Sequence, residues 1–382
     1  AIVFKHFNRK GYSLFAALGK VVVIGVLAVP TLTHARACGI ATRPANEGAD
    51  TLSFGEQRLD EVQVTGSRAP LTARQSAKIV EAISRDDIHR AEAQTINDVL
   101  KLATGVDVRQ RGGFGVQTDI SINGGTFDQI TILLNGVNIS SPQTGHNAAD
   151  FPVSLSDIER IEVLEGASAR VFGSSAFNGA INIVTRPDRE SCVRLSAEGG
   201  SFGSFGGDFG VSLLTGSVSQ KLSGGYTQSD GGTKNSDFKR RRAYYTGSYT
   251  SRYADLVWQA GLSSQDYGAS TFYSAKFDNQ WEATRRIITS AQADIKPFGD
   301  ERLVITPQAY WHRDVDHYQL TRGKEGAKNG ENYHRTDVYG ASLNAHATWL
   351  LGKTAVGMDI RKEHILSTAY GDLLPENEWK DI

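Results

Sequence analysis

The chain has 382 residues, 40 of them glycine and only one methionine, and its formal net charge is −1. This length allows two or three ordinary domains or one large β structure, and the glycine content favours strands and turns over helix bundles. A charge near zero excludes a strongly basic surface, so no nucleic-acid partner is expected.

The amino terminus has the three parts of a secretory signal peptide. Basic residues (Lys5, Arg9, Lys10) precede the apolar run 21–29, and Ala35-Arg36-Ala37 offers a small-residue cleavage site. The alternative is a membrane anchor, but the run is shorter than the ~20 residues that a spanning helix needs. Residues 1–37 are therefore predicted to be a signal peptide, and the polar segment 38–58 a flexible linker.

The two cysteines, Cys38 and Cys192, lie far apart in the sequence. Cys38 directly follows the predicted cleavage site. We therefore expect no structural disulfide in the mature chain.

Residues 59–66 read LDEVQVTG, a short extended segment with Val62 and Val64 on one side. An extended segment at the edge of a domain is suited to pairing with a strand of a partner. The alternative is that it forms only the first strand of the domain that follows.

Residues 67–189 are predicted to form one α/β domain. Ser84 and Thr95 each precede an acidic residue three positions later, which predicts two capped helices, the second ending at Gly105. Strands are expected at 79–83, 106–109, 119–122, 130–134, 161–164 and 180–185, completing one small sheet. Asn135-Gly136 predicts a tight turn, because both residues tolerate positive φ.

From residue 190 to 382 the pattern changes to a period of two. In 336–349, for example, Tyr339, Leu343 and Trp349 alternate with small or polar residues. Stretches 255–265 and 302–318 repeat this pattern, and short connections alternate with long ones. Such alternation is typical of an antiparallel transmembrane β-barrel, with about nine strands here. A secreted β-sandwich also alternates, but long strands with aromatic ends favour the membrane barrel.

Two passages carry a family resemblance. TDISINGGTFDQITILLNGVNI (118–139) and IERIEVLEGASARVFGSSAFNGAINIVT (158–185) resemble the plug domain of the TonB-dependent receptors of bacterial outer membranes. Asn123, Asn135 and Glu165 depart from the usual Arg, Asp and Arg of these passages. The residues assigned to the plug signature are Asn123, Gly124, Asn135, Gly136, Glu165, Gly166, Gly173, Gly179 and Asn182.

The resemblance implies an α+β plug domain inside an antiparallel barrel of about 22 strands, as the family has it. It places the family's TonB box at Asp60, Glu61, Val62, Gln63, Val64, Thr65 and Gly66. This element would pair with the TonB energising complex of the inner membrane. Because the sequence does not begin with methionine and ends without an evident closing strand, we expect it to be part of a longer chain.

No motif for catalysis, a cofactor or a metal is recognised. Ser174-Ser175 lacks the G-x-S-x-G context of a nucleophile elbow, the glycine-rich stretch 199–207 is interpreted as a strand turn, and HExxH and CxxC are absent. His312, Asp314 and Asp316 share one face of a predicted strand and are candidate ligand contacts. The alternative is that they form ion pairs within a polar lumen. The basic run Lys239 to Arg242 is expected at the base of an outer loop, in contact with lipopolysaccharide.

The predicted function is TonB-dependent active transport of a scarce nutrient across the bacterial outer membrane, and not an enzymatic activity. The resemblance is greatest to the cobalamin and siderophore receptors, so an iron chelate or a cobalamin-type ligand is expected, with outer-membrane lipid around the barrel and a surface lipoprotein as a further candidate partner. The alternative is a surface receptor or adhesin whose plug merely seals the barrel. Transport would require residues 60–66, because they pair with TonB, whereas adhesion would not require them.

Overall fold

The computed structural model describes residues 36–37, 63–64, 71–72, 80–146, 150–166, 176–187, 190–326, 329–350, 352–369 and 372–373. The chain divides into two compact units, residues 1–37 and 38–382. The first unit contributes one short strand, β1 (Arg36–Ala37), to the described residues. The second contains a small α/β module followed by a sheet of long strands.

The α/β module has short elements joined by turns. Its helices are α2 (Arg85–Arg90) and α3 (Ile96–Leu100), with 3-10 turns η1 (Gly113–Gly115), η2 (Phe127–Gln129) and η3 (Leu155–Asp157). Its strands are β4 (Val80–Ser84), β5 (Val106–Gln110), β6 (Thr118–Ile122), β7 (Ile130–Leu134), β8 (Val137–Asn138), β9 (Ile158–Glu165) and β10 (Gly179–Thr185).

Both helices begin where the sequence predicts them, because each has a capping box. The Ser84 hydroxyl accepts a hydrogen bond from the backbone N–H of Asp87 (3.3 Å), and the Asp87 carboxylate accepts one from the N–H of Ser84 (3.1 Å). Thr95 and Asp98 make the same reciprocal pair at α3. The second helix is shorter than expected: it ends at Leu100, and turns cover the residues before Gly105.

The strands of the module form two sheets rather than the single sheet predicted. Five strands pair in the order β4-β9-β10-β7-β8, with β10 parallel to β7 and the other pairs antiparallel. β5 and β6 form a separate antiparallel pair. Local alternation predicts that a strand exists but not which partner it takes, because pairing is decided by packing across the whole module.

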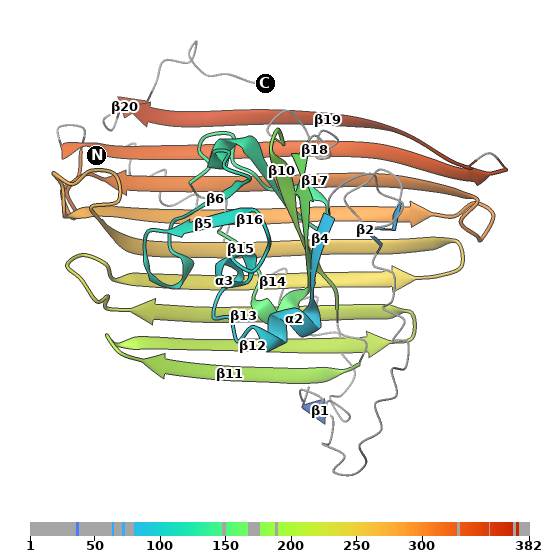
Figure 1. Cartoon of the computed structure of the whole chain (residues 1–382), viewed down its shortest axis with the longest axis horizontal. Helices are drawn as coiled ribbons and strands as arrows, with labels where there is room; N and C mark the ends of the chain where they lie inside the picture. The colour runs from blue at the N-terminus through green and yellow to red at the C-terminus, as the bar shows by residue number, and fades with distance from the viewer. Residues whose placement is uncertain are drawn as a thin grey trace. The chain divides into compact units, whose positions relative to one another are not determined.

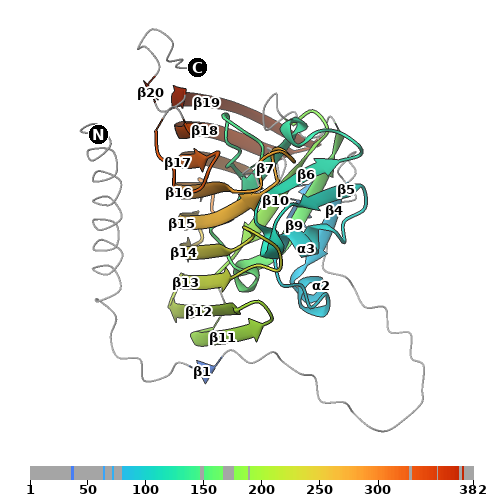
Figure 2. The same cartoon turned by 90° about the vertical axis from the view of Figure 1, so that its left-hand side faces the viewer.

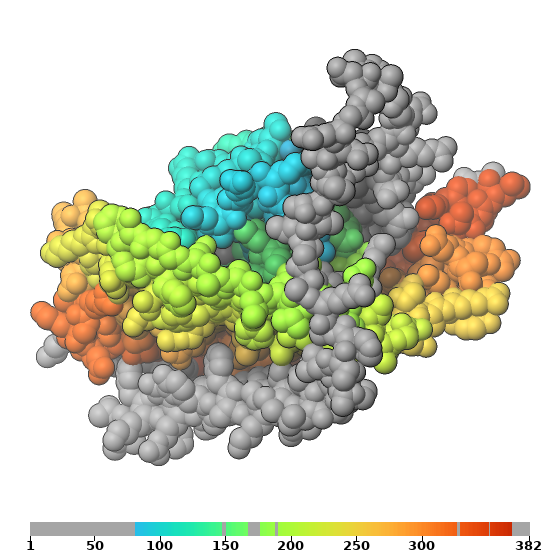
Figure 3. Space-filling view, turned by 90° about the horizontal axis from the view of Figure 1, so that it is seen from below, coloured from blue at the N-terminus to red at the C-terminus, as the bar shows by residue number. Residues whose placement is uncertain are grey.

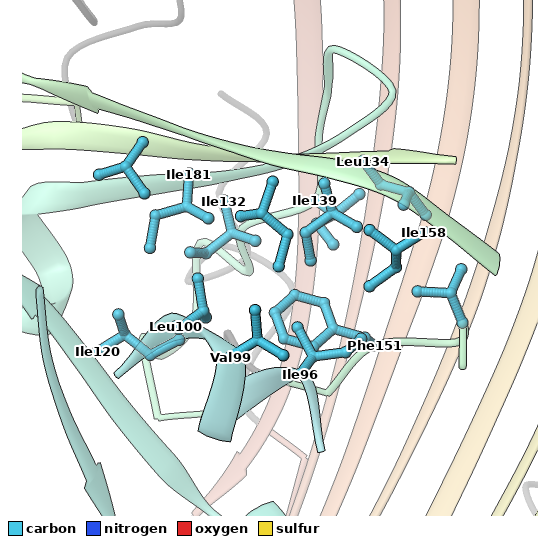
Figure 4. Close-up of a cluster of buried hydrophobic side chains, with 14 of the residues drawn as sticks. Ile96, Val99, Leu100, Ile120, Ile132, Leu134, Ile139, Phe151, Ile158 and Ile181 are labelled. Carbon is cyan, nitrogen blue, oxygen red and sulfur yellow. The ribbon is translucent and has the colours of Figure 1, made fainter. Parts of the chain in front are cut away.

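The core of the module is almost entirely aliphatic. Ile132 and Ile181 on neighbouring strands pack over Val99 and Leu100 of α3, and all four are fully buried (Figure 4). Burying a side chain of this size stabilises the fold by roughly 1.5–3 kcal/mol. The core therefore holds two short helices that would be unstable alone.

The second part of the chain is an antiparallel sheet of long strands connected in sequence order (Figure 1). The strands are β11 (Cys192–Gly200), β12 (Ser204–Thr215), β13 (Val218–Ser229), β14 (Phe238–Thr250), β15 (Ala254–Ser270), β16 (Gln280–Ile295), β17 (Leu303–Gln319), β18 (Glu331–Trp349) and β19 (Gly352–Ala369), followed by the short β20 (Asp372–Leu373). The prediction of about nine strands is confirmed.

The three longest connections lie at one end of this sheet, although the three-residue connection 201–203 lies there too. The described turns 216–217 and 251–253 are tight, whereas 230–237, 271–279 and the segment between β17 and β18 are longer. This alternation agrees with the pattern expected of an outer-membrane barrel. Among the described residues, no helix is both long and apolar enough to cross a membrane.

The two faces of the long-stranded sheet have opposite polarity. On β15, Gln259, Ser263 and Gln265 are buried, while on β18 the predicted apolar positions Tyr339 and Leu343 are about half exposed (49% and 50%). A sheet that buries its polar face and exposes its apolar face is suited to lipid on the outside.

The α/β module lies against the polar face of the long-stranded sheet. Figure 2 shows the strands of the sheet end-on, with β4 to β10 and both helices on one side of it. In the space-filling view of Figure 3 the cyan residues of the module lie directly beside the yellow-green strands. Hydrogen bonds between the two parts, described below, hold the module in this position.

One sequence expectation about covalent structure is wrong. Cys192, the first residue of β11, is disulfide-bonded. The other cysteine of the sequence, Cys38, lies outside the described residues.

Candidate functional site between the module and the sheet

The turn after β7 connects the module to the sheet. Asn135 (φ 52°) and Gly136 (φ 79°) both have positive φ, so the predicted tight turn is confirmed. The Asn135 amide donates hydrogen bonds to the Gln259 side-chain oxygen (2.7 Å) and to the Tyr244 hydroxyl (3.1 Å), which belong to β15 and β14. The turn thus presents an amide to two strands of the sheet at once.

The same turn is fixed from within the module. The Asn135 amide also donates to the Thr185 hydroxyl (2.8 Å), and its carbonyl oxygen accepts from the backbone N–H of Thr185 (2.8 Å). The Asn182 side chain accepts from the Gly136 N–H (3.0 Å) and donates to the Glu162 carboxylate (3.0 Å). Each polar group of the turn therefore has a partner, as a buried turn requires.

A buried ion pair forms a second connection. The Lys221 ammonium on β13 lies 3.1 Å from the Asp157 carboxylate of η3, and both side chains are almost completely buried. Lys221 also donates to the Ser156 carbonyl (2.7 Å), and Ser223, two residues along β13, donates to Asp157 (2.8 Å). Residues two apart on a strand share a face, so both reach the same turn.

The other residues of the plug signature stay within the module. The Asn123 amide donates to Glu165 (2.9 Å), so two of the three departures from the family pattern contact each other in an exposed position. Gly124 and Gly166 have positive φ. A Cβ on Gly179 would lie 2.5 Å from the Leu164 carbonyl oxygen, so this position requires glycine for close packing. Gly173 lies outside the described residues.

A cavity of about 320 Å³ lies between the module and the sheet at the end with the long connections. The module contributes the loop residues Gln143, Thr144 and His146. The sheet and its loops contribute Tyr273, Glu282, Asp316, Tyr318, Asn332 and His334. A cavity that joins two parts of a molecule and combines aromatic with polar groups is the usual form of a ligand site.

The loop of the module that lines this cavity is held by a carboxylate. Asp119 on β6 contacts the His146 ring nitrogen (2.7 Å) and the Arg111 guanidinium (2.8 Å). Burial alone would raise the pKa of Asp119, but the hydrogen bonds from His146 and Arg111 hold that pKa below its usual value. The carboxylate is therefore ionised at neutral pH and keeps the loop in place.

The structure separates the three candidate ligand contacts on β17. His312 is completely buried and contacts Asp314 (3.2 Å), which pairs with Arg286 of β16 (2.5 Å). These two side chains thus form an ion-pair cluster within the wall, the alternative that the sequence left open. Asp316 alone lines the cavity.

The basic run 239–242 is also divided by the strand. Lys239 and Arg241 are exposed, but the Arg240 guanidinium donates to the Phe114 (3.0 Å) and Gly115 (3.1 Å) carbonyls of the module. Arg242 pairs with Asp208. Alternate side chains of a strand point to opposite faces, so only half of this run can contact lipopolysaccharide.

The segment assigned as the TonB box is described only in part. Gln63–Val64 forms the two-residue strand β2, which pairs with β3 (Leu71–Thr72) in the register Gln63–Thr72 and Val64–Leu71. Asp60, Glu61, Val62, Thr65 and Gly66 lie outside the described residues.

Sequence reasoning missed most of the cavity. The loop 140–146 has no periodicity, and Glu282 was not distinguished from other polar residues of its strand. The alternation along β16 does place Glu282 and Thr284 on the buried face of the sheet. This alternation is the sequence pattern from which Glu282 could have been predicted as a cavity residue. Within the described part of the chain, no group of three or more His, Cys, Asp or Glu is arranged to hold a metal ion.

Comparisons with known proteins agree with this architecture. Residues 72–180 match the TonB-dependent Receptor Plug Domain family. The chain is 28% identical over 324 residues to a vitamin B12 transporter, BtuB, of Photobacterium profundum, covering 75% of this chain and 52% of that protein. It is 35% identical over 131 residues to BtuB of Vibrio cholerae, covering 34% of this chain and 21% of that one.

Solved structures show the same fold at low sequence identity. FpvA of P. aeruginosa, bound to heterologous pyoverdines, has a TM-score of 0.65 at 17% identity, covering 83% of this chain and 46% of that one. The unliganded ferric citrate transporter FecA has a TM-score of 0.64 at 17% identity, covering 81% and 52%. The chain spans about half the length of these relatives or less, and the BtuB proteins and FecA are named as transporters. Residues 72–180 therefore belong to the plug domain family of the TonB-dependent receptors, and the long-stranded sheet has the fold of the outer-membrane barrels of these receptors.

Proposed function

We propose that the complete protein actively transports a scarce nutrient, such as a ferric siderophore or cobalamin, across the outer membrane with energy supplied by TonB. The observation that carries this proposal is the plug hydrogen-bonded to the polar face of a lipid-facing sheet, with a cavity at the end that has the long connections. This arrangement admits a ligand from one side and blocks diffusion to the other.

Passage requires the plug to move or partly unfold, because its core is well packed. The contacts between plug and wall are polar, and water can replace them when the two separate. Replacing one hydrogen bond between plug and wall by a hydrogen bond to water costs about 1 kcal/mol. An external pull on a weakly held segment of the plug can supply this energy.

The strand Gln63–Val64 is the proposed attachment point for that pull. Its pairing with β3 involves only two residues on each side. A partner strand can replace so short a pairing at little cost, and strand addition gives main-chain hydrogen bonds. TonB is the proposed partner, through residues 60–66.

The cargo and the outer partners belong to the same proposal. The similar proteins named above are a vitamin B12 transporter, a ferric citrate transporter and a protein bound to pyoverdines, which supports a cobalamin-type ligand or an iron chelate. The exposed Lys239 and Arg241 suit contact with lipopolysaccharide. A surface lipoprotein that hands over the cargo is a further proposed partner.

The test is uptake by the complete gene in a deletion strain, with radiolabelled cobalamin and radiolabelled ferric siderophores. Val64→Pro removes a backbone donor and disturbs strand pairing. We expect energy-dependent uptake of one cargo that this substitution abolishes, while Asn46→Pro in the predicted linker leaves uptake unchanged.

The second candidate function, a surface receptor or adhesin with a sealed barrel, gives a different result. Ligand or cell binding would then be the same with Val64→Pro as with the unchanged protein. Binding without uptake, insensitive to the proline, would contradict the transport proposal.

A further inference from the structure

The cavity between the plug and the sheet has an acidic wall. Glu282 and Asp316 line it, together with amide and aromatic side chains, and among its described lining residues there is no Lys or Arg. The histidines His146 and His334 also line it, and the His146 ring already contacts Asp119 (2.7 Å). The charge of this wall is therefore negative.

The strand register places the two carboxylates together. Asp316 of β17 lies opposite Thr284 of β16, and Glu282 is two residues from Thr284 on the same face. Side chains in this diagonal relation are within reach of one another. Glu282 is 2% exposed and Asp316 is 9% exposed, so water screens the charge of this pair poorly.

The two carboxyl groups are hydrogen-bonded to each other, so one of them carries the shared proton. Their other partners are few. The Asp316 Oδ2 atom accepts a long hydrogen bond from the Gln143 amide (3.4 Å), and Glu282 accepts one from the Tyr273 hydroxyl (2.5 Å). A buried acceptor with so long a hydrogen bond can take a better donor from a ligand.

The nearby cations are occupied by other carboxylates. Arg286 pairs with Asp314, Arg111 with Asp119, and Arg322, in the β17–β18 loop, with Asp237. None of these guanidinium groups lines the cavity. The proton shared by Glu282 and Asp316 leaves one negative charge on the pair, and among the described lining residues no Lys or Arg offsets that charge.

From this geometry we infer that the cavity selects a neutral or cationic ligand that presents N–H donors, such as a primary amide or an ammonium group, and rejects an anionic chelate. Asp316 and Glu282 accept from these donors, while Tyr273 and Tyr318, in edge-to-face contact at 5.4 Å, pack against the ligand body. An anionic ligand would meet like charges in a site of low dielectric. This inference rests on the proposed function, because it assigns the cargo's chemistry.

The experiment is direct binding to the purified complete protein in detergent, measured by calorimetry. The probes are cyanocobalamin, which is neutral and rich in amides; ferrioxamine B, which is cationic; ferric enterobactin, which is an anion; and Ca²⁺ alone. The variants are Asp316→Asn and Glu282→Gln. Asp237→Asn is the matched control, because it is a carboxylate at the same end of the sheet that already has a cation partner.

We expect the neutral or the cationic probe to bind, and either cavity variant to weaken that binding about tenfold, while the control leaves it unchanged. Preferential binding of ferric enterobactin, failure of both the neutral and the cationic probe, or insensitivity to both variants would overturn the inference. Binding of Ca²⁺ alone that is lost in both variants would also overturn it, since the carboxylates would then serve a metal ion.

The outcome is separable from that of the transport proposal, because detergent binding needs no TonB. A probe that binds through Asp316 but is not taken up in a Val64-dependent manner leaves this inference standing and contradicts transport.

Discussion

The plug and the strand wall bury opposite kinds of side chain. The plug hides Ile132 and Leu134 completely, as a water-soluble domain does. The wall hides Arg286 and His312, while Leu195 and Ile360 are 79% and 63% exposed. The surroundings of each part explain which side chains it buries. The plug packs upon itself, whereas the wall has its polar face toward the plug and its apolar face toward lipid.

The boundary between the two parts is polar because both contribute polar groups to it. Separation therefore exposes hydrogen-bonding groups to water rather than apolar surface, and water satisfies them. The comparison teaches that the plug can be stable in itself and yet only moderately attached to the wall. Substitutions in the plug, in the wall and at their boundary test this difference.

The largest effect is expected from breaking the buried ion pair at the boundary. Lys221→Met leaves the Asp157 carboxylate buried without its cation, at a cost of about 3–5 kcal/mol. The free energy of unfolding should fall accordingly, as measured by hydrogen exchange of the peptide that contains η3 in the complete protein. The double variant with Asp157→Asn should recover part of the loss, and no recovery would contradict the pairing.

The second effect concerns the core of the plug. Ile181→Ala removes fully buried methyl groups and should destabilise the plug by about 2–5 kcal/mol, because the packed core collapses only partly. Hydrogen exchange of plug peptides measures this, with wall peptides unaffected. Leu102→Ala is the control, since Leu102 is 56% exposed, and an equal loss there would count against a distinct core.

The third effect concerns the lipid face of the wall. Leu343→Arg should cost about 2–4 kcal/mol, because the charge would lie against hydrocarbon. Heat-modified mobility of the complete protein on gels measures barrel stability. The neighbouring Ser342→Arg points to the opposite face and should be tolerated better. A reversed order of the two variants would mean that the faces are misassigned.

The fourth effect concerns the plug turn at the boundary. Asn135→Ala removes hydrogen bonds to two wall strands and should loosen this contact by about 1–3 kcal/mol. We expect faster hydrogen exchange in residues 130–138 and higher ion conductance of the complete protein in planar bilayers. Asn123→Ala, whose amide contacts only the exposed Glu165, should change neither. Equal effects of the Asn135→Ala and Asn123→Ala substitutions would contradict the proposed role of the turn in attaching the plug to the wall.

The smallest effect concerns pH. Because the pKa of Asp119 is lowered in the folded protein, its contribution to stability is present above the unfolded value near 4 and is lost as the pH falls through the folded pKa. Protease cleavage in loop 140–146 should therefore increase in acid below about pH 4. Asp119→Asn should show that increased cleavage already at pH 7, and a cleavage rate in this variant like that of the unchanged protein would contradict the link.

Much of the fold could be predicted because its signals are local. The capping pairs at Ser84 and Thr95, the turn at Asn135 and the alternation around Leu343 each depend on a few neighbouring residues, and the structure agrees with all of them. The candidate site could be predicted only in part. Asp316 was singled out by its position on a strand, but Glu282 and His146 gave no comparable signal, because their common location depends on three distant segments.

The helices, most strands, the family resemblance and the polarity of each sheet face can be predicted from the amino-acid sequence, since periodicity, caps and turns are encoded over short distances. Which groups meet depends on the three-dimensional packing. It paired β5 with β6 outside the main plug sheet, matched Arg286 to Asp314, and left Asp316 facing a cavity. The physical reason is that pairing and neutralisation depend on packing between segments far apart in the chain, and no local pattern records which cation or strand will be nearest.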